Sequence, residues 1–451
     1  MTKNQEFTAR IEGATSEGLG VARLEGRAVF VKGAIPGETC RIALTKIGKT
    51  AVYGRLLEVL EASAHRTEPD CPYYGRCGGC DYRHMDYALE AQLKADRVAQ
   101  TLKRIGSMDL EQLPITAAQV QEGYRNKAVY PVRMVNGAPE VGFFRARTHE
   151  LIAVEHCRIQ NAVADAAREA LLTWMKRYNI SAYDEETQHG YVRSLFVRTA
   201  DATGEVLVCV VANTERLPRA RELTAEMQRA IPNLTTLVHG VHTRPGNAVL
   251  GDRFVTLFGE GYIEDILCGL RFRISPRSFY QVNRDQAEKL YEKAIEKAGL
   301  TGKETVLDLY CGTGTITLCL AKQAGRAIGV EIIPEAIEDA KGNAQRNGVE
   351  NAEFFCADAG EAAARFAAQG IHPDVVVVDP PRKGLSADVI EAIDTMDPQR
   401  VVYVSCDPAT LARDVKLFAE RGFTAQDAET VDLFPRCAHI ESVLCLQRET
   451  N

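Results

Sequence analysis

The feature that most constrains the fold is a regular alternation of strand-like and helix-like runs after about residue 271. Strand-like runs such as ETVLDLY, RAIGVEI, DVVVVDPP and RVVYVSCD are separated by helix-like runs such as ITLCLAKQAG and PEAIEDAKGNAQRNG. This alternation is typical of βαβ units, which build a buried and mostly parallel sheet. We therefore predict an α/β Rossmann-like domain over residues 271–451, which ends in a β-pair formed by TVDLFP and ESVLCLQRE.

Two regions of different character precede this domain. Residues 5–60 contain five short strand-like segments between glycine-containing turns, which predicts a small closed barrel of the OB type. Such barrels often bind single-stranded nucleic acid, although a barrel that only packs on a neighbouring domain has the same pattern. A cysteine-rich stretch follows, then a helix-like run near 86–104, which we expect to dock on the C-terminal domain, and then several β-like runs. The chain of 451 residues is therefore expected to have three parts, 1–61, 62–270 and 271–451.

Composition and charge restrict the class of protein. The chain has no run of about 20 apolar residues, and its N-terminus lacks the apolar segment of a secretory signal. Thirteen cysteines are an odd number in a long chain, whereas a secreted disulfide framework favours an even number in a short one. We therefore expect a cytoplasmic protein without membrane contact. The net charge of −7 argues against an extended nucleic-acid surface, but residues 1–61 carry nine Lys and Arg against seven Asp and Glu, which is compatible with a local basic groove.

A glycine turn in DLYCGTGTITL (308–318) predicts a ligand site. It follows a strand and opens a helix, where glycines and backbone N–H groups let a ligand approach closely. The third glycine of a dinucleotide fingerprint is replaced by Thr317. The next strand ends in Glu331, where doubly wound folds place a carboxylate that binds ribose. A nicotinamide needs no carboxylate directly before the turn, whereas Asp308 at that position suits the ammonium group of S-adenosylmethionine.

Acidic residues end four successive strands of the predicted sheet. Because the carboxyl ends of parallel strands line the ligand crevice, these side chains are expected to lie close together. A glycine-rich turn with a purely structural role would not require them. The four residues are Asp308, Glu331, Asp358 and Asp379.

The fifth strand ends in Cys406, which suggests covalent chemistry at the same crevice. Addition of a thiolate to C6 of uracil makes the ring an enolate, whose C5 attacks an electrophilic methyl group, and a base then removes the C5 proton. Cys406 could also be a buried strand cysteine, but its place before Asp407 and Pro408 favours exposure. For the base, CAHIESV offers His439 and Glu441; the start of the last strand favours Glu441, although the pattern does not decide between them.

Together these motifs resemble the RNA uracil-C5 methyltransferase family. The match covers the whole C-terminal domain and rests on SFYQVN, DLYCGTGTITL, VEI, DPPRKG, SCDPATLARD and HIES, in this order and spacing. Adenine-N6 enzymes would carry an aromatic residue where Arg382 follows Asp-Pro-Pro, and RNA cytosine-C5 enzymes would carry a Pro-Cys there. The resemblance implies a class I methyltransferase domain that uses S-adenosylmethionine to methylate RNA.

The resemblance also implies a role for each matching residue. Cys406 is the nucleophile and Glu441 the proton acceptor. Phe279 is expected to stack near the target base, although core packing explains an aromatic residue there equally well. The cofactor contacts are Gln281, Tyr310, Glu331 and Asp379, with Asp358 and Thr315 as secondary contacts.

The N-terminal half resembles the ribosomal branch of this family. GLGVARLEGRAVFVKGAIPGE resembles part of a TRAM domain, which is an RNA-binding barrel. By spacing alone, three close cysteines and a distant fourth suit either zinc or an iron–sulfur cluster, and His156 could replace Cys157 as a zinc ligand. The resemblance implies a [4Fe–4S] cluster in the central β-rich domain, with a structural role because the expected reaction transfers no electrons. Its ligands would be Cys71, Cys77, Cys80 and Cys157.

We expect the substrate to be RNA, and the TRAM barrel and the cluster cysteines favour 23S ribosomal RNA. Transfer RNA is the alternative, although its bacterial branch typically lacks both features. Arg125 and Lys127 in YRNKA are candidate RNA contacts, though most surface arginines and lysines are only solvated. A non-catalytic RNA-binding protein would lack Cys406 or Glu441, and an iron–sulfur redox enzyme would use the glycine turn for a nicotinamide. Nothing in the sequence requires a dimer, so we expect a monomer.

Overall fold

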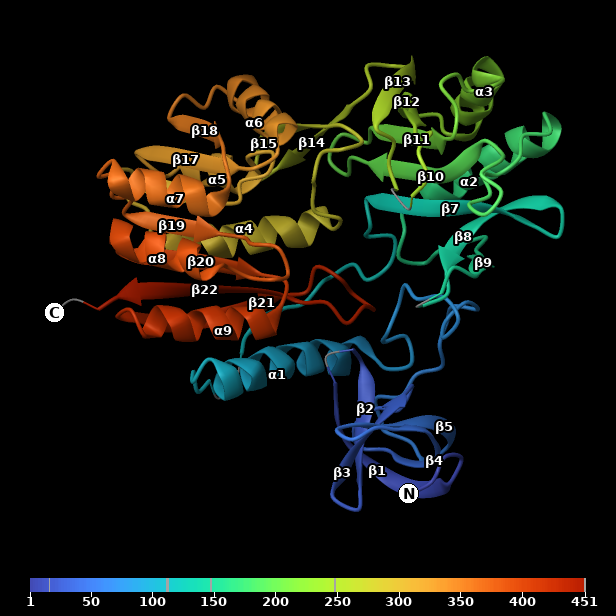
Figure 1. The fold of residues 1–451 in the computed structure, drawn as a ribbon, viewed down its shortest axis with the longest axis horizontal. Helices are drawn as coiled ribbons and strands as arrows, with labels where there is room; N and C mark the ends of the chain where they lie inside the picture. The colour runs from blue at the N-terminus through green and yellow to red at the C-terminus, as the bar shows by residue number, and fades with distance from the viewer. Residues whose placement is uncertain (16, 111–112, 147, 247–248, 450–451) are drawn as a thin grey trace.

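The computed structural model describes residues 1–451 except 16, 111–112, 147, 247–248 and 450–451. In Figure 1 the chain forms an N-terminal barrel, a central sheet with helices packed on it, and a larger C-terminal sheet covered by helices. The barrel is closed in the order β1-β2-β3-β5-β4, which confirms the OB-like prediction. Its apolar side chains alternate along each strand and fill the interior. The strands are β1 (Glu6–Ala14), β2 (Leu19–Leu24), β3 (Arg27–Lys32), β4 (Thr39–Ile47) and β5 (Val52–Glu61).

The central sheet has the order β13-β12-β11-β10-β7-β8-β9. The strands β10 and β11 correspond to the predicted β-like runs, and both are buried along their whole length. Two helices, α2 (Ala162–Arg177) and α3 (Ala220–Ala230), pack on the sheet through a shared apolar core that includes Trp174. The strands are β7 (Lys127–Val135), β8 (Ala138–Phe144), β9 (Leu151–Ala153), β10 (Val192–Thr199), β11 (Val206–Ala212), β12 (Leu234–Val241) and β13 (Arg253–Phe258).

The C-terminal sheet has the order β18-β17-β16-β19-β20-β22-β21-β6. Its first five strands in this order are parallel, and β21 and β22 form the predicted antiparallel pair, so the Rossmann-like prediction is confirmed. The strands are β16 (Thr305–Asp308), β17 (Arg326–Glu331), β18 (Ala352–Cys356), β19 (Val375–Val378), β20 (Arg400–Ser405), β21 (Phe423–Val431), β22 (Glu441–Arg448) and β6 (Ile115–Thr116).

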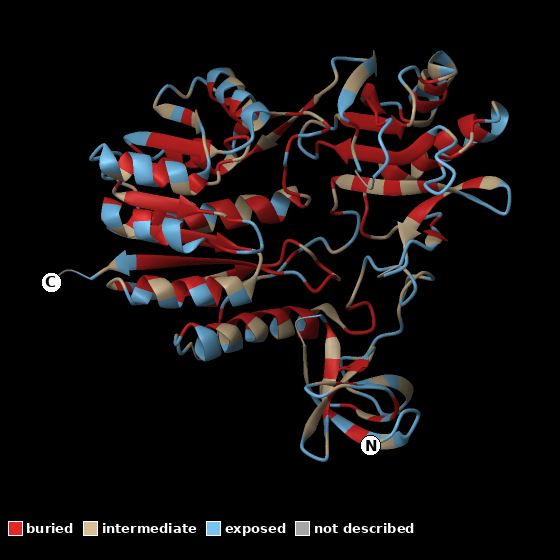
Figure 2. Ribbon diagram, in the orientation of Figure 1, coloured by how far each residue is buried: buried red, intermediate tan, exposed pale blue. Residues whose placement is uncertain are grey.

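Helices cover both faces of the C-terminal sheet, and Figure 2 shows buried strands between helices whose outer faces are exposed. One face packs against α4 (Arg284–Ala298), α5 (Thr315–Ala321) and α6 (Pro334–Arg346). The other packs against α7 (Ala359–Ala368), α8 (Ala387–Met396), α9 (Pro408–Ala419) and α1 (Tyr87–Ile105). Burial of both faces explains why the central strands read as continuous apolar runs, such as VVVV in β19.

Parts of the segment before the central sheet belong spatially to the C-terminal sheet. The helix α1 packs against α9, and the short strand β6 pairs with β21, which confirms that the helix predicted near 86–104 docks on this domain. The Asp86 side chain caps α1 by accepting a hydrogen bond from the Leu89 N–H. The hairpin β14 (Ile263–Leu267) and β15 (Leu270–Ile274) links the two sheets, so residues 270 and 271 both lie in β15. Among the described residues, none of the helices combines the length and apolar character that a membrane span requires.

Candidate active site

A cleft of about 890 Å³ lies at the carboxyl ends of the parallel strands of the C-terminal sheet. This edge is where ligands bind in open α/β sheets. The cleft is lined by both predicted catalytic residues and all four predicted cofactor contacts, which are Cys406, Glu441, Gln281, Tyr310, Glu331 and Asp379. The secondary candidates that also line it are Asp358, Phe279, Arg125, Lys127 and His439. The fold therefore brings together residues that lie far apart in the sequence.

Strand direction explains this convergence. Glu331 ends β17, Asp379 follows β19 and Cys406 follows β20, and all three strands run parallel. The strand β22 runs antiparallel and therefore begins, with Glu441, at the edge where its neighbours end. Ser405 pairs with Ser442 across β20 and β22, so Cys406 and Glu441 lie one residue beyond that pair on adjacent strands. A nucleophile and a candidate base are thus placed side by side.

The surroundings of Cys406 favour its protonated form. Burial raises the pKa of the thiol to about 11, and the carboxylates of Glu441 and Asp379 act in the same direction, while Arg382 opposes them. Burial also raises the pKa of Glu441 well above its usual range, and Asp379 adds to this effect. The pKa of Asp379 itself is raised to about 7, first by burial and then by Asp308. Such shifts cluster at functional sites, because catalytic groups exchange protons near neutral pH.

His439, the other candidate base, has a different environment. It is exposed, and its ring stacks edge-on against Phe434 with centroids 5.7 Å apart. The Arg382 Nη2 atom lies 3.3 Å from His439 Nε2. Although the residue is partly open to solvent, desolvation by the protein around it and the positive charge of Arg382 lower the pKa of His439 to about 4, so the imidazole is neutral near pH 7. A neutral imidazole beside an arginine is suited to hydrogen bonding of a substrate, whereas Glu441 lies deeper, with an exposed fraction of 4%.

The glycine turn forms the cofactor end of the cleft. The Glu331 carboxylate accepts hydrogen bonds from the backbone N–H groups of Gly312 (3.3 Å) and Ile333 (3.0 Å), which fixes its position at the end of β17. Gly314 has a φ of +82° and begins α5, and a Cβ there would approach the Phe354 ring to 3.1 Å. A glycine is therefore required at this position by both conformation and space.

Two acidic strand ends and one threonine behave differently from expectation. Asp308 is 1% exposed and is not among the described residues that line the cleft. Its carboxylate accepts hydrogen bonds from the Thr317 hydroxyl (2.6 Å) and the Tyr310 N–H (3.3 Å), so it stabilises the glycine turn from inside. Thr315 points its hydroxyl toward Tyr291, 3.3 Å away, and does not line the cleft either.

Asp358 does line the cleft, but its carboxylate also caps α7. Phe279 is 62% exposed, which argues against a core-packing role.

A second cavity of about 150 Å³ is lined by all four predicted metal ligands, Cys71, Cys77, Cys80 and Cys157. We call it the cysteine cavity. The first three cysteines lie in the loop between β5 and α1, and the fourth lies in the loop before α2. Arg125 lines both this cavity and the catalytic cleft, so the two sites are neighbours.

The donor set of the cysteine cavity fits a group ligated by sulfur. Four thiols with arginines nearby suit an anionic thiolate cluster, and hydrogen bonds to sulfur are usual around such groups. Burial raises the pKa of Cys157 to about 11, while hydrogen bonds from the backbone of Ile159 and Gln160 act against this rise. Within the described part of the chain, no set of three or more His, Cys, Asp and Glu side chains is already arranged to hold a metal ion. His156 also lines the cavity, with its Nδ1 2.6 Å from Asp165. The cluster, and the choice between iron and zinc, therefore stay predictions.

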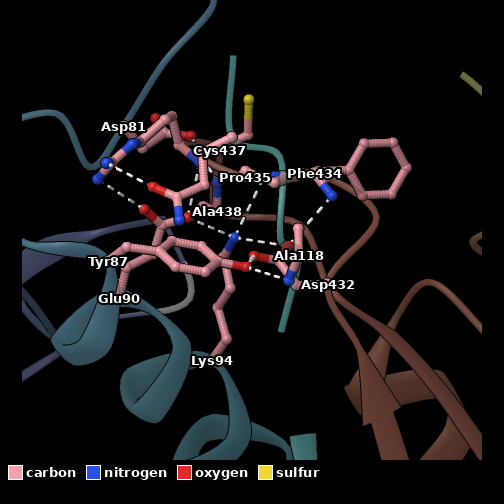
Figure 3. Close-up of polar contacts among 12 residues, drawn as sticks. Asp81, Tyr87, Glu90, Lys94, Ala118, Asp432, Phe434, Pro435, Cys437 and Ala438 are labelled. Carbon is pink, nitrogen blue, oxygen red and sulfur yellow. Dashed lines mark hydrogen bonds and ion pairs between the residues drawn. The ribbon is translucent and has the colours of Figure 1, made fainter. Parts of the chain in front are cut away.

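A buried ion cluster, which the sequence did not reveal, holds residues 432–440, here called the β21–β22 loop (Figure 3). The Lys94 ammonium of α1 donates hydrogen bonds to Glu90 (2.7 Å) and Asp432 (2.9 Å). The Tyr87 hydroxyl donates to the other Asp432 oxygen (2.8 Å), and Glu90 accepts from the backbone of Arg436 (2.7 Å). In the sequence, Glu90 and Lys94 have the spacing of an ordinary surface pair on a helix. Because this loop leads directly into Glu441, α1 contributes to the position of the candidate base.

The β21–β22 loop also connects the cleft with the cysteine cavity. Its Cys437 is buried, donates a hydrogen bond to the Gly79 carbonyl (3.0 Å) and accepts one from Arg125 (3.3 Å). Two residues later, His439 lines the cleft. The contacts of Cys437 with this region could not be predicted, because nothing in its local sequence relates it to the distant cysteines 71–80.

Comparisons with known proteins agree with this arrangement. A family model described as tRNA (Uracil-5-)-methyltransferase matches residues 259–449, and a TRAM domain model matches residues 1–57. A protein named uncharacterized RNA methyltransferase from Clostridium acetobutylicum is 41% identical over 99% of this chain and 98% of its own length. A protein of the same description from Listeria innocua is also 41% identical, over 99% of this chain and 98% of its own.

One solved structure is similar over nearly the full length of the chain. It is the tRNA (uracil-54, C5)-methyltransferase of Pyrococcus abyssi in complex with S-adenosyl-L-homocysteine. Its TM-score is 0.79 at 25% sequence identity, and the match covers 97% of this chain and 99% of the archaeal one. The TRAM match and this structural match confirm the N-terminal barrel and the class I methyltransferase domain.

Proposed function

Because the chain belongs to the RNA uracil-C5 methyltransferase family, we propose that it methylates C5 of a uridine in 23S ribosomal RNA, with Cys406 as the covalent nucleophile. The observation that carries the proposal is the placement of Cys406 and Glu441 on adjacent strands at the cleft. S-adenosylmethionine is the cofactor of this family and supplies an electrophilic methyl group when it is bound. The proposal places the enzyme in the cytoplasm as a monomer.

The first step is addition of the Cys406 sulfur to C6 of uracil. Because the pKa of the thiol is about 11 in the free protein, the thiol must lose its proton to solvent in the open cleft as the substrate binds. Arg382 favours the resulting thiolate and opposes the effect of the Glu441 and Asp379 carboxylates. The sulfur donates its electron pair to C6, the electrons of the C5–C6 double bond form a C4–C5 double bond, and the electrons of the C4 carbonyl move to O4 to give an enolate. C5 is then nucleophilic and would form its new bond to the methyl carbon as the bond between that carbon and the cofactor's sulfur breaks, so that S-adenosylhomocysteine leaves and the C4 carbonyl forms again.

The second step is removal of the C5 proton by Glu441. The carboxylate accepts this proton, the C5–C6 double bond forms again, and the Cys406 sulfur leaves C6 as a thiolate. Glu441 then returns its proton to solvent. Burial raises the pKa of Glu441, so its carboxylate accepts a proton more readily than that of a solvent-exposed glutamate.

The cofactor would occupy the part of the cleft beside the glycine turn. Glu331 is oriented there by two backbone N–H groups, so its carboxylate suits the ribose hydroxyls. Asp379 lies between this region and Cys406 in the strand order, where its negative charge favours a ligand with a positive sulfonium group. Tyr310 and Gln281 complete the lining.

The four cysteines of the cysteine cavity would hold the [4Fe–4S] cluster. A bound cluster would tie the loop before α1 to the loop before α2. Its contribution would be structural, because methyl transfer moves no unpaired electrons.

Transfer RNA is the second candidate substrate, and one observation favours it. The archaeal enzyme, which is described as acting on uracil-54 of tRNA, matches this chain over 97% of its length. A chain with this overall layout is therefore compatible with either RNA. The TRAM barrel and the four convergent cysteines are the features that favour ribosomal RNA here.

Methyl transfer from labelled S-adenosylmethionine to separate transcripts of 23S rRNA and tRNA tests the proposal. We expect label in 23S rRNA, at C5 of uridine by mass spectrometry of nucleosides. Faster labelling of tRNA would overturn the ribosomal assignment, and no label in either RNA would overturn the proposed reaction. The Cys406→Ala variant is the matched control, since it removes one sulfur atom at a half-buried position.

A further inference from the structure

A third cavity, of about 300 Å³, lies on the central sheet outside both sites described above. We call it the β7 pocket. It is lined by residues of β7, β8 and β10 and by nearby loops, among them Pro131, Arg133, Phe143, Phe144, His149 and Arg193. Its volume is at the low end of the range of small-molecule pockets, which suits a ligand as small as one nucleobase.

The strand β7 connects this pocket with the catalytic cleft. Along it, Lys127, Val129, Pro131 and Arg133 are half-exposed, while the residues between them are buried, so these four share one face. Lys127 lines the cleft, and the other three line the β7 pocket. Six residues of extended strand span roughly 20 Å. A strand of RNA whose target uridine enters the cleft therefore has a continuous path to the pocket.

Aromatic and cationic side chains give the pocket the chemistry of a base-binding site. Phe144 contacts His149 in a tilted arrangement, with ring centroids 5.5 Å apart and an angle of 59° between the ring planes, and the Arg133 guanidinium lies 5.4 Å from the Phe144 ring centre. The remaining lining includes the apolar Val129, Pro131 and Phe143 and also Glu185, whose carboxylate forms an ion pair with Arg133. Unpaired bases stack on aromatic rings and on guanidinium planes in most single-stranded RNA sites.

Arg193 is the second feature that points to a ligand. It is 6% exposed, and its guanidinium lies 3.6 Å from the centre of the Tyr183 ring. It donates to the carbonyls of Arg244 (2.8 Å) and Gly246 (3.3 Å), but its Nε is buried without a hydrogen-bond partner. Among the described residues it forms no ion pair. A buried guanidinium with an unsatisfied donor is costly unless an anion or an acceptor binds there.

We propose that the β7 pocket binds one unpaired nucleobase of the substrate RNA, a few nucleotides from the target uridine. The base stacks on Phe144 and presents an acceptor to Arg193, while the phosphates follow Lys127 and Arg133. This inference rests on the proposed function, because it takes the RNA in the cleft as the source of the base. The pocket sets specificity by accepting a flanking nucleotide that the catalytic residues do not touch.

A double-mutant cycle, in which Phe144 of the protein and one base of the RNA are removed separately and together, tests the proposal. Short RNAs that contain the methylated uridine are made with one abasic nucleotide at each flanking position, and their Kd is measured by fluorescence anisotropy. For the unmodified protein we expect one position at which loss of the base weakens binding by about 5- to 150-fold, which corresponds to one stacked base. In Phe144→Ala, loss of the same base should have almost no further effect.

Two further variants keep the test decisive. Phe144→Leu removes the ring but retains apolar volume, so it should show the same loss of sensitivity to the missing base as Phe144→Ala. It therefore replaces Phe144→Ala in the test if the alanine disturbs folding. Phe254→Ala is the matched control, because Phe254 is a half-buried phenylalanine of the same sheet beneath Arg277, with a separation of 5.1 Å, but does not line the pocket.

Equal effects of base loss in the unmodified protein and in both Phe144 variants would overturn the proposal, as would the absence of any sensitive position. Failure of the proposed function is a separate outcome. It would show as no methyl transfer by the unmodified protein to intact RNA, whereas failure of the pocket alone leaves that transfer in place.

Discussion

The catalytic cleft and the cysteine cavity both contain cysteines, share Arg125 and differ in the charge around sulfur. In the cleft, Cys406 lies among the carboxylates of Glu441 and Asp379, which favour the thiol. In the cysteine cavity, burial likewise raises the pKa of Cys157 to about 11, but the neighbouring charges of Arg83 and Arg125 act in the opposite direction. Burial therefore favours the protonated thiol at both sites in the free protein, and the sites differ in their neighbours: carboxylates beside Cys406 oppose a thiolate, whereas arginines in the cavity favour one. The charged side chains around each site thus distinguish a candidate nucleophile in the cleft from candidate metal ligands in the cavity.

The largest predicted effect is on the cleft side of this comparison. Replacing Glu441 by Gln removes the base but keeps the shape of the side chain, so the Cys406 adduct should form and fail to resolve. We expect turnover to fall by about 10²- to 10⁴-fold, the usual contribution of a general base. Denaturing electrophoresis of the enzyme with ordinary uridine RNA should show a long-lived covalent complex. An unchanged turnover would show that another group removes the C5 proton. The turnover of His439→Ala would then be measured to test whether that group is His439.

The next largest effect compares the same substitution at one cysteine of each site. Cys77→Ser should lose iron from protein purified without oxygen, whereas Cys406→Ser should retain it. If the cluster is structural, its loss lowers the melting temperature, and each kcal/mol of lost stability corresponds to about 2–4 °C in a domain of 150–250 residues. Stoichiometric zinc without iron in the unmodified protein would refute the cluster. Equal iron in both variants would show that Cys77 is not a ligand.

The smallest predicted effect is a pH dependence of cofactor affinity, which tests the negative charge that the cleft carries at Asp379. Because the pKa of Asp379 is raised to about 7, its carboxylate is charged above that pH and neutral below it. A positively charged ligand binds the charged form better, so affinity for S-adenosylmethionine should fall as the pH drops below 7, by up to tenfold per pH unit. Calorimetry between pH 5.5 and 8.5 measures this trend. Asp379→Asn should bind weakly at every pH, and a slope retained in that variant would assign the titration elsewhere.

Many of the residues that line the cleft could be predicted from the sequence, whereas the buried contacts that hold these residues in place could not. Parallel strands end at one edge, so Glu331, Asp379 and Cys406 had to converge once their strands were recognised. The inward turn of Asp308 could not be foreseen, because it depends on a buried hydrogen bond from the Thr317 hydroxyl, nine residues later on α5.

The ion cluster around Lys94 was hidden for a related reason. Lys94 and Asp432 are 338 positions apart, and no local pattern pairs them. The helices α2 and α3 lie in a stretch that was described only by its β-like runs, although Ala167, Leu171 and Trp174 recur at helical spacing. Sequence motifs thus locate residues that share a strand end, while tertiary packing decides which way they face.

Covalent trapping tests the central claim most directly. The enzyme is incubated with S-adenosylmethionine and RNA that contains 5-fluorouridine, from which the base cannot remove fluorine as it removes a proton. We predict a stable complex of protein, RNA and transferred methyl group, with the RNA attached to the peptide that contains Cys406, and no complex with Cys406→Ala. An adduct that persists in Cys406→Ala, or methyl transfer to ordinary RNA with no trapped complex on the fluorinated RNA, would contradict the mechanism.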